Sequence, residues 1–171
     1  PWYLTEANAE EQLQWLYQAV KQPDVVAVGE CGLDKLRGAS MSLQQEVFRA
    51  CISLAEQMHL PLVVHAVKCT EELFRIHKEL KPQMPWIIHG FRGRKEVAEQ
   101  YLKRGFYLSF GEHFHDEALR STPLERLLLE TDESRLSMEE ICRKAASVYG
   151  LPAEILAARI TSNAQKVLFL Q

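Results

Sequence analysis

The chain has 171 residues, of which 47% are hydrophobic, so it is long enough and apolar enough to form one domain with a buried core. Its formal net charge of −3 excludes a protein that coats nucleic acid through bulk positive charge. No apolar run approaches the ~20 residues that cross a bilayer, so we expect no membrane contact. The four cysteines lack the spacing of a zinc knuckle or a redox pair. We therefore predict a single domain over residues 1–171, in the cytoplasm, with reduced thiols.

Helical and strand-like segments alternate along the chain, as in an α/β protein. Apolar residues at helical spacing predict the helices, and short apolar runs rich in β-branched residues predict buried strands. In chain order, the expected elements are a helix over 5–20 capped by Thr5, a strand over 25–28, a polar loop over 31–38, a helix opened by a capping box at Ser42, a strand over 60–64, a helix over 71–80, a strand over 86–88, a helix over 94–103, strands over 106–110 and 124–129, and helices from Ser137 onward with breaks at Gly150 and Thr161.

Five strands are expected, each followed by a helix or by a loop long enough for a crossover. Such connections make neighbouring strands parallel and bring their carboxyl ends to one side of the sheet. Four of the strands run into residues that can bind a metal, and these residues are Glu30, His65, His89 and Asp132. Polar ends on four strands favour a ring of ligands over the single crevice of an open sheet. We therefore expect an α/β fold of the TIM-type (β/α) barrel class.

The four strand-end residues form a mixed nitrogen and oxygen ligand set. Burying such side chains without compensation costs several kcal/mol, and a shared cation would compensate that cost. The set suits zinc, manganese or iron, and magnesium less well because of the two histidines. Either histidine alone would more often be a core residue, but their equivalent positions favour ligation. Glu130, two residues before Asp132, is expected one layer deeper, where we predict a structural role.

Basic residues follow the same strand ends, which favours an anionic substrate such as a phosphodiester. His113 is either an ordinary residue of a polar loop or a substrate contact, and substrate contact is the function that we predict for it. We interpret His59 and His77 as surface or packing residues. No phosphate-binding glycine loop, dinucleotide-binding motif or nucleophile elbow is present. The basic residues beyond the strand ends are Lys35, Arg37, Lys68, Arg92 and Arg94.

Six short motifs also resemble, in order and spacing, those of the TatD family of metal-dependent deoxyribonucleases. They are residues 28–34 (VGECGLD), 63–65 (VVH), 88–93 (IHGFRG), 108–111 (LSFG), 128–132 (LLETD) and 163–169 (NAQKVLF). The resemblance implies a TIM-type barrel, one or two divalent metals (zinc, manganese or magnesium) and hydrolysis of DNA phosphodiester bonds.

Matched onto this chain, the resemblance implies that Glu30 bridges two metals and that His65 and His89 hold one of them. Asp132 would bind the other metal and would orient or deprotonate the attacking water. Glu30 and Asp132 are then the catalytic residues. The substrate-binding residues that we predict from their positions beyond the strand ends are Lys35, Lys68, Arg92 and His113.

The chain departs from the family pattern in three ways. Family members open with a strand that carries a His-x-His pair, and since this strand is not in the sequence, we expect the first two β/α units to be missing. Lys68 stands where the family often has arginine. The loop after Asp132 is shorter than usual and lacks its proline.

Two other functions fit these residues, namely hydrolysis of another ester or amide and a non-catalytic scaffold that binds a protein partner.

Overall fold

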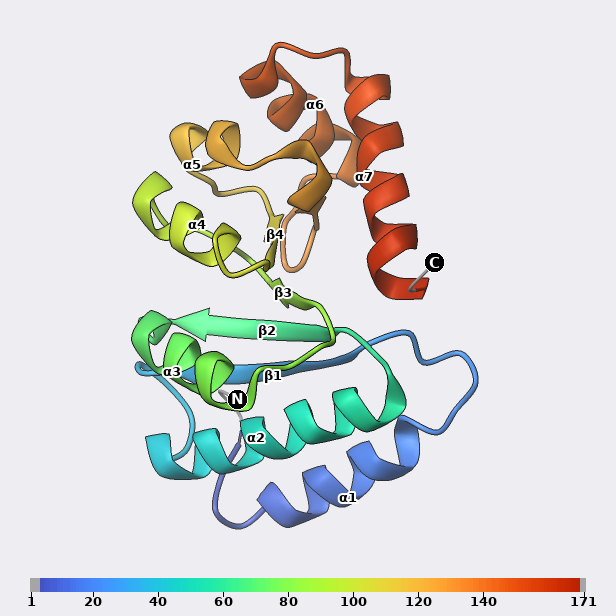
Figure 1. The fold of residues 1–171 in the computed structure, drawn as a ribbon. Coiled ribbons are helices and arrows are strands. Elements are labelled where there is room, and N and C mark those ends of the chain that lie inside the picture. Colours follow the sequence, from blue (N-terminus) through green and yellow to red (C-terminus); the bar gives the residue numbers. More distant parts are fainter. Residues whose placement is uncertain (1–3, 170–171) are drawn as a thin grey trace. The chain divides into compact units, whose positions relative to one another are not determined.

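A computed structural model describes residues 4–169, and the chain divides into two compact units, Pro1–Trp86 and Ile87–Gln171 (Figure 1). Within the described residues, none of the helices has the length and apolar character needed to traverse a lipid bilayer. The prediction of a single domain over residues 1–171 stays a prediction.

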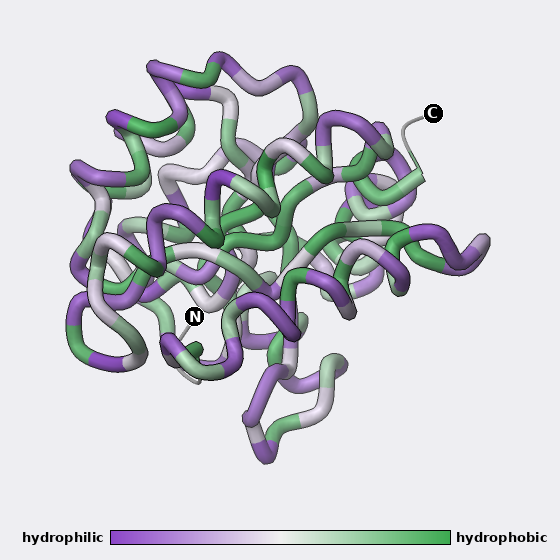
Figure 2. Tube along the Cα trace, turned by 90° about the horizontal axis from the view of Figure 1, so that it is seen from below, coloured by the Kyte–Doolittle hydropathy of each residue, from purple (hydrophilic) through white to green (hydrophobic). Residues whose placement is uncertain are grey.

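The first unit is built around two parallel strands. Strand β1 pairs with β2 so that Gly32 lies opposite His65 and Asp34 opposite Val67. Helices α2 and α3 pack against these strands, and α1 packs against α2. The helices alternate between hydrophilic and hydrophobic positions along their length (Figure 2). The elements are α1 (Ala9–Ala19), β1 (Val28–Asp34), α2 (Met41–Met58), β2 (Leu62–Val67) and α3 (Thr70–Leu80).

Strand β1 differs from its prediction. It begins at Val28 and continues to Asp34, so half of the expected loop over 31–38 is strand. Glycine disfavours a strand locally, but Gly32 lies so close to β2 that a Cβ atom would overlap the backbone oxygen of His65. Absence of a side chain is thus what permits pairing here. The polar loop is confined to residues 35–39.

Other boundaries also shift in the first unit. Strand β2 starts at Leu62 and ends at Val67, beyond the predicted strand over 60–64. Helix α1 begins after Asn8, because Thr5 enters a turn in which its N–H donates to Asn8 Oδ1 at 2.7 Å. Ser40, and not Ser42, caps α2 by accepting from the N–H of Leu43.

The second unit carries three short parallel strands, with β4 paired on one side with β3 and on the other with β5. Their residues are fully apolar except Ser109, and all are buried. The elements are β3 (Trp86–Ile88), which starts on the last residue of the first unit, α4 (Lys95–Leu102), β4 (Tyr107–Phe110), α5 (Asp116–Ser121), a 3-10 turn (Leu124–Arg126), β5 (Leu127–Leu129), α6 (Met138–Tyr149) and α7 (Ala153–Phe169).

The helix signals near the C-terminus are partly confirmed. Helix α6 starts at Ser137 as predicted, where Ser137 and Glu140 form a capping box, and Gly150 ends that helix in the left-handed conformation. The predicted break at Thr161 is wrong, since α7 is continuous. Its buried face includes Asn163, whose Nδ2 donates to the backbone oxygen of Leu127 at 2.8 Å and so ties the helix to β5.

Replacing Gly32 by alanine should destabilise the protein by roughly 3 kcal/mol or more, because the new Cβ would force β1 away from β2. Gly150→Ala is the matched control. Gly150 also has a positive φ, 67°, but no atom lies within 4 Å of an added Cβ. Gly150→Ala should therefore lower the free energy of unfolding only by the backbone strain that it adds, about 1 kcal/mol. Urea unfolding of both variants measures the difference, and equal losses would contradict the close-approach explanation.

Candidate metal and catalytic site

Glu30 and His65 lie together in the first unit, but not at strand ends as predicted. Glu30 is the third residue of β1 and His65 the fourth of β2. The ring Nδ1 of His65 lies 2.8 Å from Glu30 Oε1, and its Nε2 lies 3.0 Å from Asp34 Oδ2. The imidazole is therefore held between two carboxylates. We call Glu30, Asp34 and His65 the first histidine group.

Strand periodicity produces this arrangement. Side chains two residues apart on a strand point to the same face, so Glu30 and Asp34 share a face with the position of Gly32 between them. His65 is the partner of Gly32 in the parallel register. Its side chain consequently lies on the same face, with one carboxylate at each ring nitrogen.

Asp34 is the most constrained member of the first histidine group. Its side chain is only 4% exposed, and Oδ1 accepts hydrogen bonds from the backbone N–H groups of Leu36 at 2.7 Å and Arg37 at 3.1 Å. Burial raises the pKa of Asp34, but the hydrogen bonds from His65 and from these N–H groups outweigh it, so the net pKa is lowered. Asp34 is thus a carboxylate at neutral pH.

The pKa of His65 shifts in the opposite direction. Burial lowers it, whereas the hydrogen bonds to Glu30 and Asp34 favour the imidazolium, and the net pKa is raised. A positive charge between the two carboxylates is therefore favourable in this group, whether a proton or a cation carries it.

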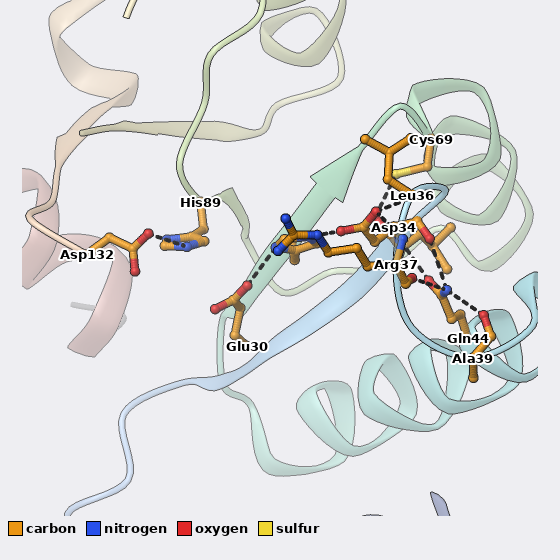
Figure 3. A network of polar contacts seen from close by, with 11 residues as sticks. Glu30, Asp34, Leu36, Arg37, Ala39, Gln44, Cys69, His89 and Asp132 are labelled. Atoms are coloured by element: carbon orange, nitrogen blue, oxygen red, sulfur yellow. Dashed lines mark hydrogen bonds and ion pairs between the residues drawn. The ribbon is translucent and has the colours of Figure 1, made fainter. Parts of the chain in front are cut away.

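His89, Glu130 and Asp132 form a second histidine group in the second unit. His89 directly follows β3, as predicted, and the two acidic residues follow β5. Nδ1 of His89 lies 2.9 Å from Glu130 Oε1, and Nε2 lies 3.8 Å from Asp132 Oδ2. Figure 3 shows Asp132 facing the ring of His89. Asp132 has a φ of 45°, a conformation that aspartate tolerates better than most residues.

The second histidine group fits a metal ion. One ligand atom from each of its three residues lies within 4.8 Å of the others. Glu130 Oε1 is buried without a hydrogen-bond partner, since the nearby His89 nitrogen is at ion-pair distance but not in hydrogen-bond geometry. A buried carboxylate oxygen of this kind is costly unless a cation compensates it. Imidazole and carboxylate together suit zinc or manganese.

The sequence prediction undervalued two carboxylates. Asp34 was not considered as a site residue, although its spacing of four from Glu30 on one strand was a usable signal. Glu130 was predicted to be structural, but it contacts His89 directly. The prediction that Glu30, His65, His89 and Asp132 share one metal centre involves both units and stays a prediction.

The predicted substrate-binding residues follow strands. Lys35 comes directly after β1 and forms an ion pair with Glu72 at 2.7 Å, which raises the pKa of Lys35. Lys68 follows β2 and is exposed. In the second unit, Arg92 follows β3 and His113 follows β4, and both are exposed.

A parallel sheet with helical crossovers and imidazole–carboxylate groups defines a metal-binding α/β protein of barrel type. The chain belongs to the TatD family, because the family model described as "TatD related DNase" matches residues 1–169. The resemblance noted in the sequence is therefore confirmed, and so is the fold class that it implied.

Relatives and solved structures agree with this assignment. The chain is 37% identical over 142 residues to the "uncharacterized metal-dependent hydrolase YabD" of Bacillus subtilis, covering 77% of this chain and 56% of that protein. It is 30% identical over 174 residues to the "3'-5' ssDNA/RNA exonuclease TatD" of Citrobacter koseri, covering 90% and 66%. The chain thus spans less than two-thirds of the length of these relatives. The crystal structure of the TatD homologue YJJV from Escherichia coli superposes with a TM-score of 0.82 at 23% identity, covering 95% of this chain and 71% of that one.

The raised pKa of His65 has a consequence for stability in the metal-free protein. A group whose pKa is raised by folding stabilises the folded state below its unfolded pKa, and this contribution is lost as the pH rises through the folded pKa. With chelator present, the stability advantage of wild type over His65→Gln should therefore shrink as the pH rises above about 6.5. Urea unfolding of both proteins at each pH measures the difference in their free energies of unfolding. His59→Asn is the control, since His59 caps α2 and lies outside both groups; a constant advantage of wild type over His65→Gln would refute the prediction.

Proposed function

We propose that this protein is a metal-dependent hydrolase that cleaves phosphodiester bonds of nucleic acid, with DNA as the substrate. The observation that carries the proposal is the second histidine group, in which a buried carboxylate oxygen lacks a hydrogen bond beside an imidazole. Membership of the TatD family and the names of its relatives as nucleases and metal-dependent hydrolases support the proposal.

The proposed metal ligands are Glu30, His65, His89 and Asp132, as in the sequence prediction. A bound divalent metal would lower the pKa of water and neutralise charge on the phosphate oxygens. Asp132 is 43% exposed, so its carboxylate can reach solvent and orient or deprotonate the attacking water. Glu30 is 35% exposed and faces His65, which suits a carboxylate that binds a cation from the strand face.

Substrate binding is proposed for basic residues that follow the strands, Lys35, Lys68 and Arg92, together with His113. Arg92 presents a guanidinium, which can hold a phosphate through two hydrogen bonds, whereas Lys68 offers a single point charge. We also propose a cytoplasmic location. The four cysteines are free and buried, and burial raises the pKa of Cys69 to about 12, which suits a reducing compartment.

Removing either ligand histidine should abolish activity. We expect His65→Ala and His89→Ala each to lower the rate on single-stranded DNA by more than about 100-fold and to lose the thermal stabilisation given by zinc or manganese. The assay is nuclease turnover on labelled DNA and RNA, with phosphomonoester, lactone and amide substrates alongside. His59→Asn is the matched control and should keep activity. Wild-type protein without metal binding, or with turnover only on a lactone or amide, would overturn the proposal.

Arg92→Ala should weaken binding of single-stranded DNA. Loss of one phosphate contact makes the slope of log K against log salt shallower by about 0.7. Fluorescence anisotropy with chelator present, which prevents cleavage, measures both quantities. Lys103→Ala removes the same charge from the region between α4 and β4, before the strand begins, and should leave the slope unchanged. Identical slopes for wild type and Arg92→Ala would exclude Arg92 from the DNA contact.

A further inference from the structure

We propose that Asp34 is a positioning residue that fixes the tautomer of His65, and that Gln44 holds Asp34 in place for this purpose. The inference rests on the proposed function in taking His65 as a metal ligand. It assigns roles to two buried polar residues, Asp34 and Gln44, that the sequence prediction did not include.

The two nitrogens of His65 have different surroundings. Nε2 faces Asp34, whose side chain is 4% exposed and whose other oxygen is already bound by backbone N–H groups. Nδ1 faces Glu30, whose side chain is 35% exposed. A ring nitrogen binds a metal only through its lone pair, so one nitrogen must carry hydrogen and the other must be free of it. A cation from solvent therefore has easier access to the more exposed Glu30 side than to the Asp34 side.

Asp34 determines which nitrogen carries the hydrogen. Its carboxylate can only accept hydrogen bonds, so Nε2 of His65 must donate. In the neutral ring, the lone pair is then on Nδ1 and points toward Glu30 Oε1, 2.8 Å away. A lone pair and a carboxylate oxygen at this distance repel unless a proton or a metal ion lies between them. The spacing also suits two ligand atoms of one cation, since metal bonds of about 2 Å place neighbouring ligands roughly 3 Å apart.

Gln44 holds the backbone on which Asp34 depends. It lies in the first turn of α2 and is only 2% exposed. Its Oε1 accepts from the N–H of Asp34 at 2.7 Å, and its Nε2 donates to the backbone oxygens of Asp34, Arg37 and Ala39 at 3.0, 3.1 and 2.9 Å. Figure 3 shows these contacts converging on the loop after β1. One side chain thus holds both ends of the turn that binds the Asp34 carboxylate.

Asp34→Asn tests the proposal with little change of shape. The asparagine oxygen can keep the bonds from Leu36 and Arg37, which leaves the amide nitrogen facing Nε2 of His65. That amide donates, so Nε2 becomes the acceptor and the hydrogen moves to Nδ1, the nitrogen that must bind the metal. Asp24→Asn is the matched control, because Asp24 is exposed and the chemical change is identical.

Two measurements are made on the purified protein. Long-range ¹⁵N–¹H correlation spectra of the metal-free protein, at a pH where the ring is neutral, report the tautomer of His65. Competition with a chromogenic chelator reports the zinc dissociation constant. We expect the Nε2–H tautomer in wild type and Asp24→Asn, the Nδ1–H tautomer in Asp34→Asn, and zinc affinity lower by 10- to 100-fold in Asp34→Asn alone.

Each outcome separates the inference from the proposed function. An Nδ1–H tautomer in wild type, or a zinc affinity of Asp34→Asn within twofold of wild type, overturns the role of Asp34. Absence of zinc binding by wild type overturns the proposed function, while the tautomer still tests Asp34. If Asp34→Asn does not fold, the wild-type spectrum remains decisive.

Gln44→Met tests the role of Gln44, because methionine keeps the size of the side chain without its hydrogen bonds. This variant should bind zinc severalfold more weakly than wild type. Unchanged zinc affinity in the folded variant overturns the role of Gln44.

Discussion

The placement of His65 between two carboxylates of β1 is the constraint on which the first unit depends. It requires strands so close that only glycine fits opposite the histidine, and Gly32 meets this requirement. The same closeness puts Glu30 Oε1 and Asp34 Oδ2 within 3.0 Å of the ring. Two carboxylates around one imidazole are favourable only with positive charge present. Strand packing therefore brings two negative charges close to one imidazole, and a bound cation can compensate them.

The second unit also places a histidine between two carboxylates, but on different parts of the backbone. His89 and its acidic partners lie on segments that directly follow β3 and β5, rather than inside strands. Each ring nitrogen again has one carboxylate near it, with Glu130 16% exposed and Asp132 43% exposed. In both units, then, one of the two carboxylates beside the ring is less exposed than the other. Such an inner and outer pair is what metal-binding histidines commonly have, because the inner partner orients the ring.

Prediction from sequence succeeded where the signal was local. Strand β3 and the start of α6 at Ser137 were placed correctly, since each depends on a few adjacent residues. The end of β1 was missed because Gly32 discourages a strand locally and is tolerated only through pairing with β2. Asp34 was missed for the same reason. Strand periodicity predicts which face of the sheet a side chain lies on, and it could not be applied to Asp34 because this residue was assigned to a loop. The motif order, in contrast, identified the family, since it samples the whole chain.

Gln44 illustrates why a buried polar network persists when an apolar side chain could fill its space. Its hydrogen bonds replace bonds to water, so their net gain in stability is only about 1 kcal/mol each, and an apolar residue of similar shape can be nearly neutral. What an apolar residue cannot do is bind the backbone of residues 34, 37 and 39 at the same time. These hydrogen bonds fix a short polar turn whose own residues, apart from Asp34, are largely exposed. The network is therefore better explained by the precision it gives to Asp34 than by the stability it adds.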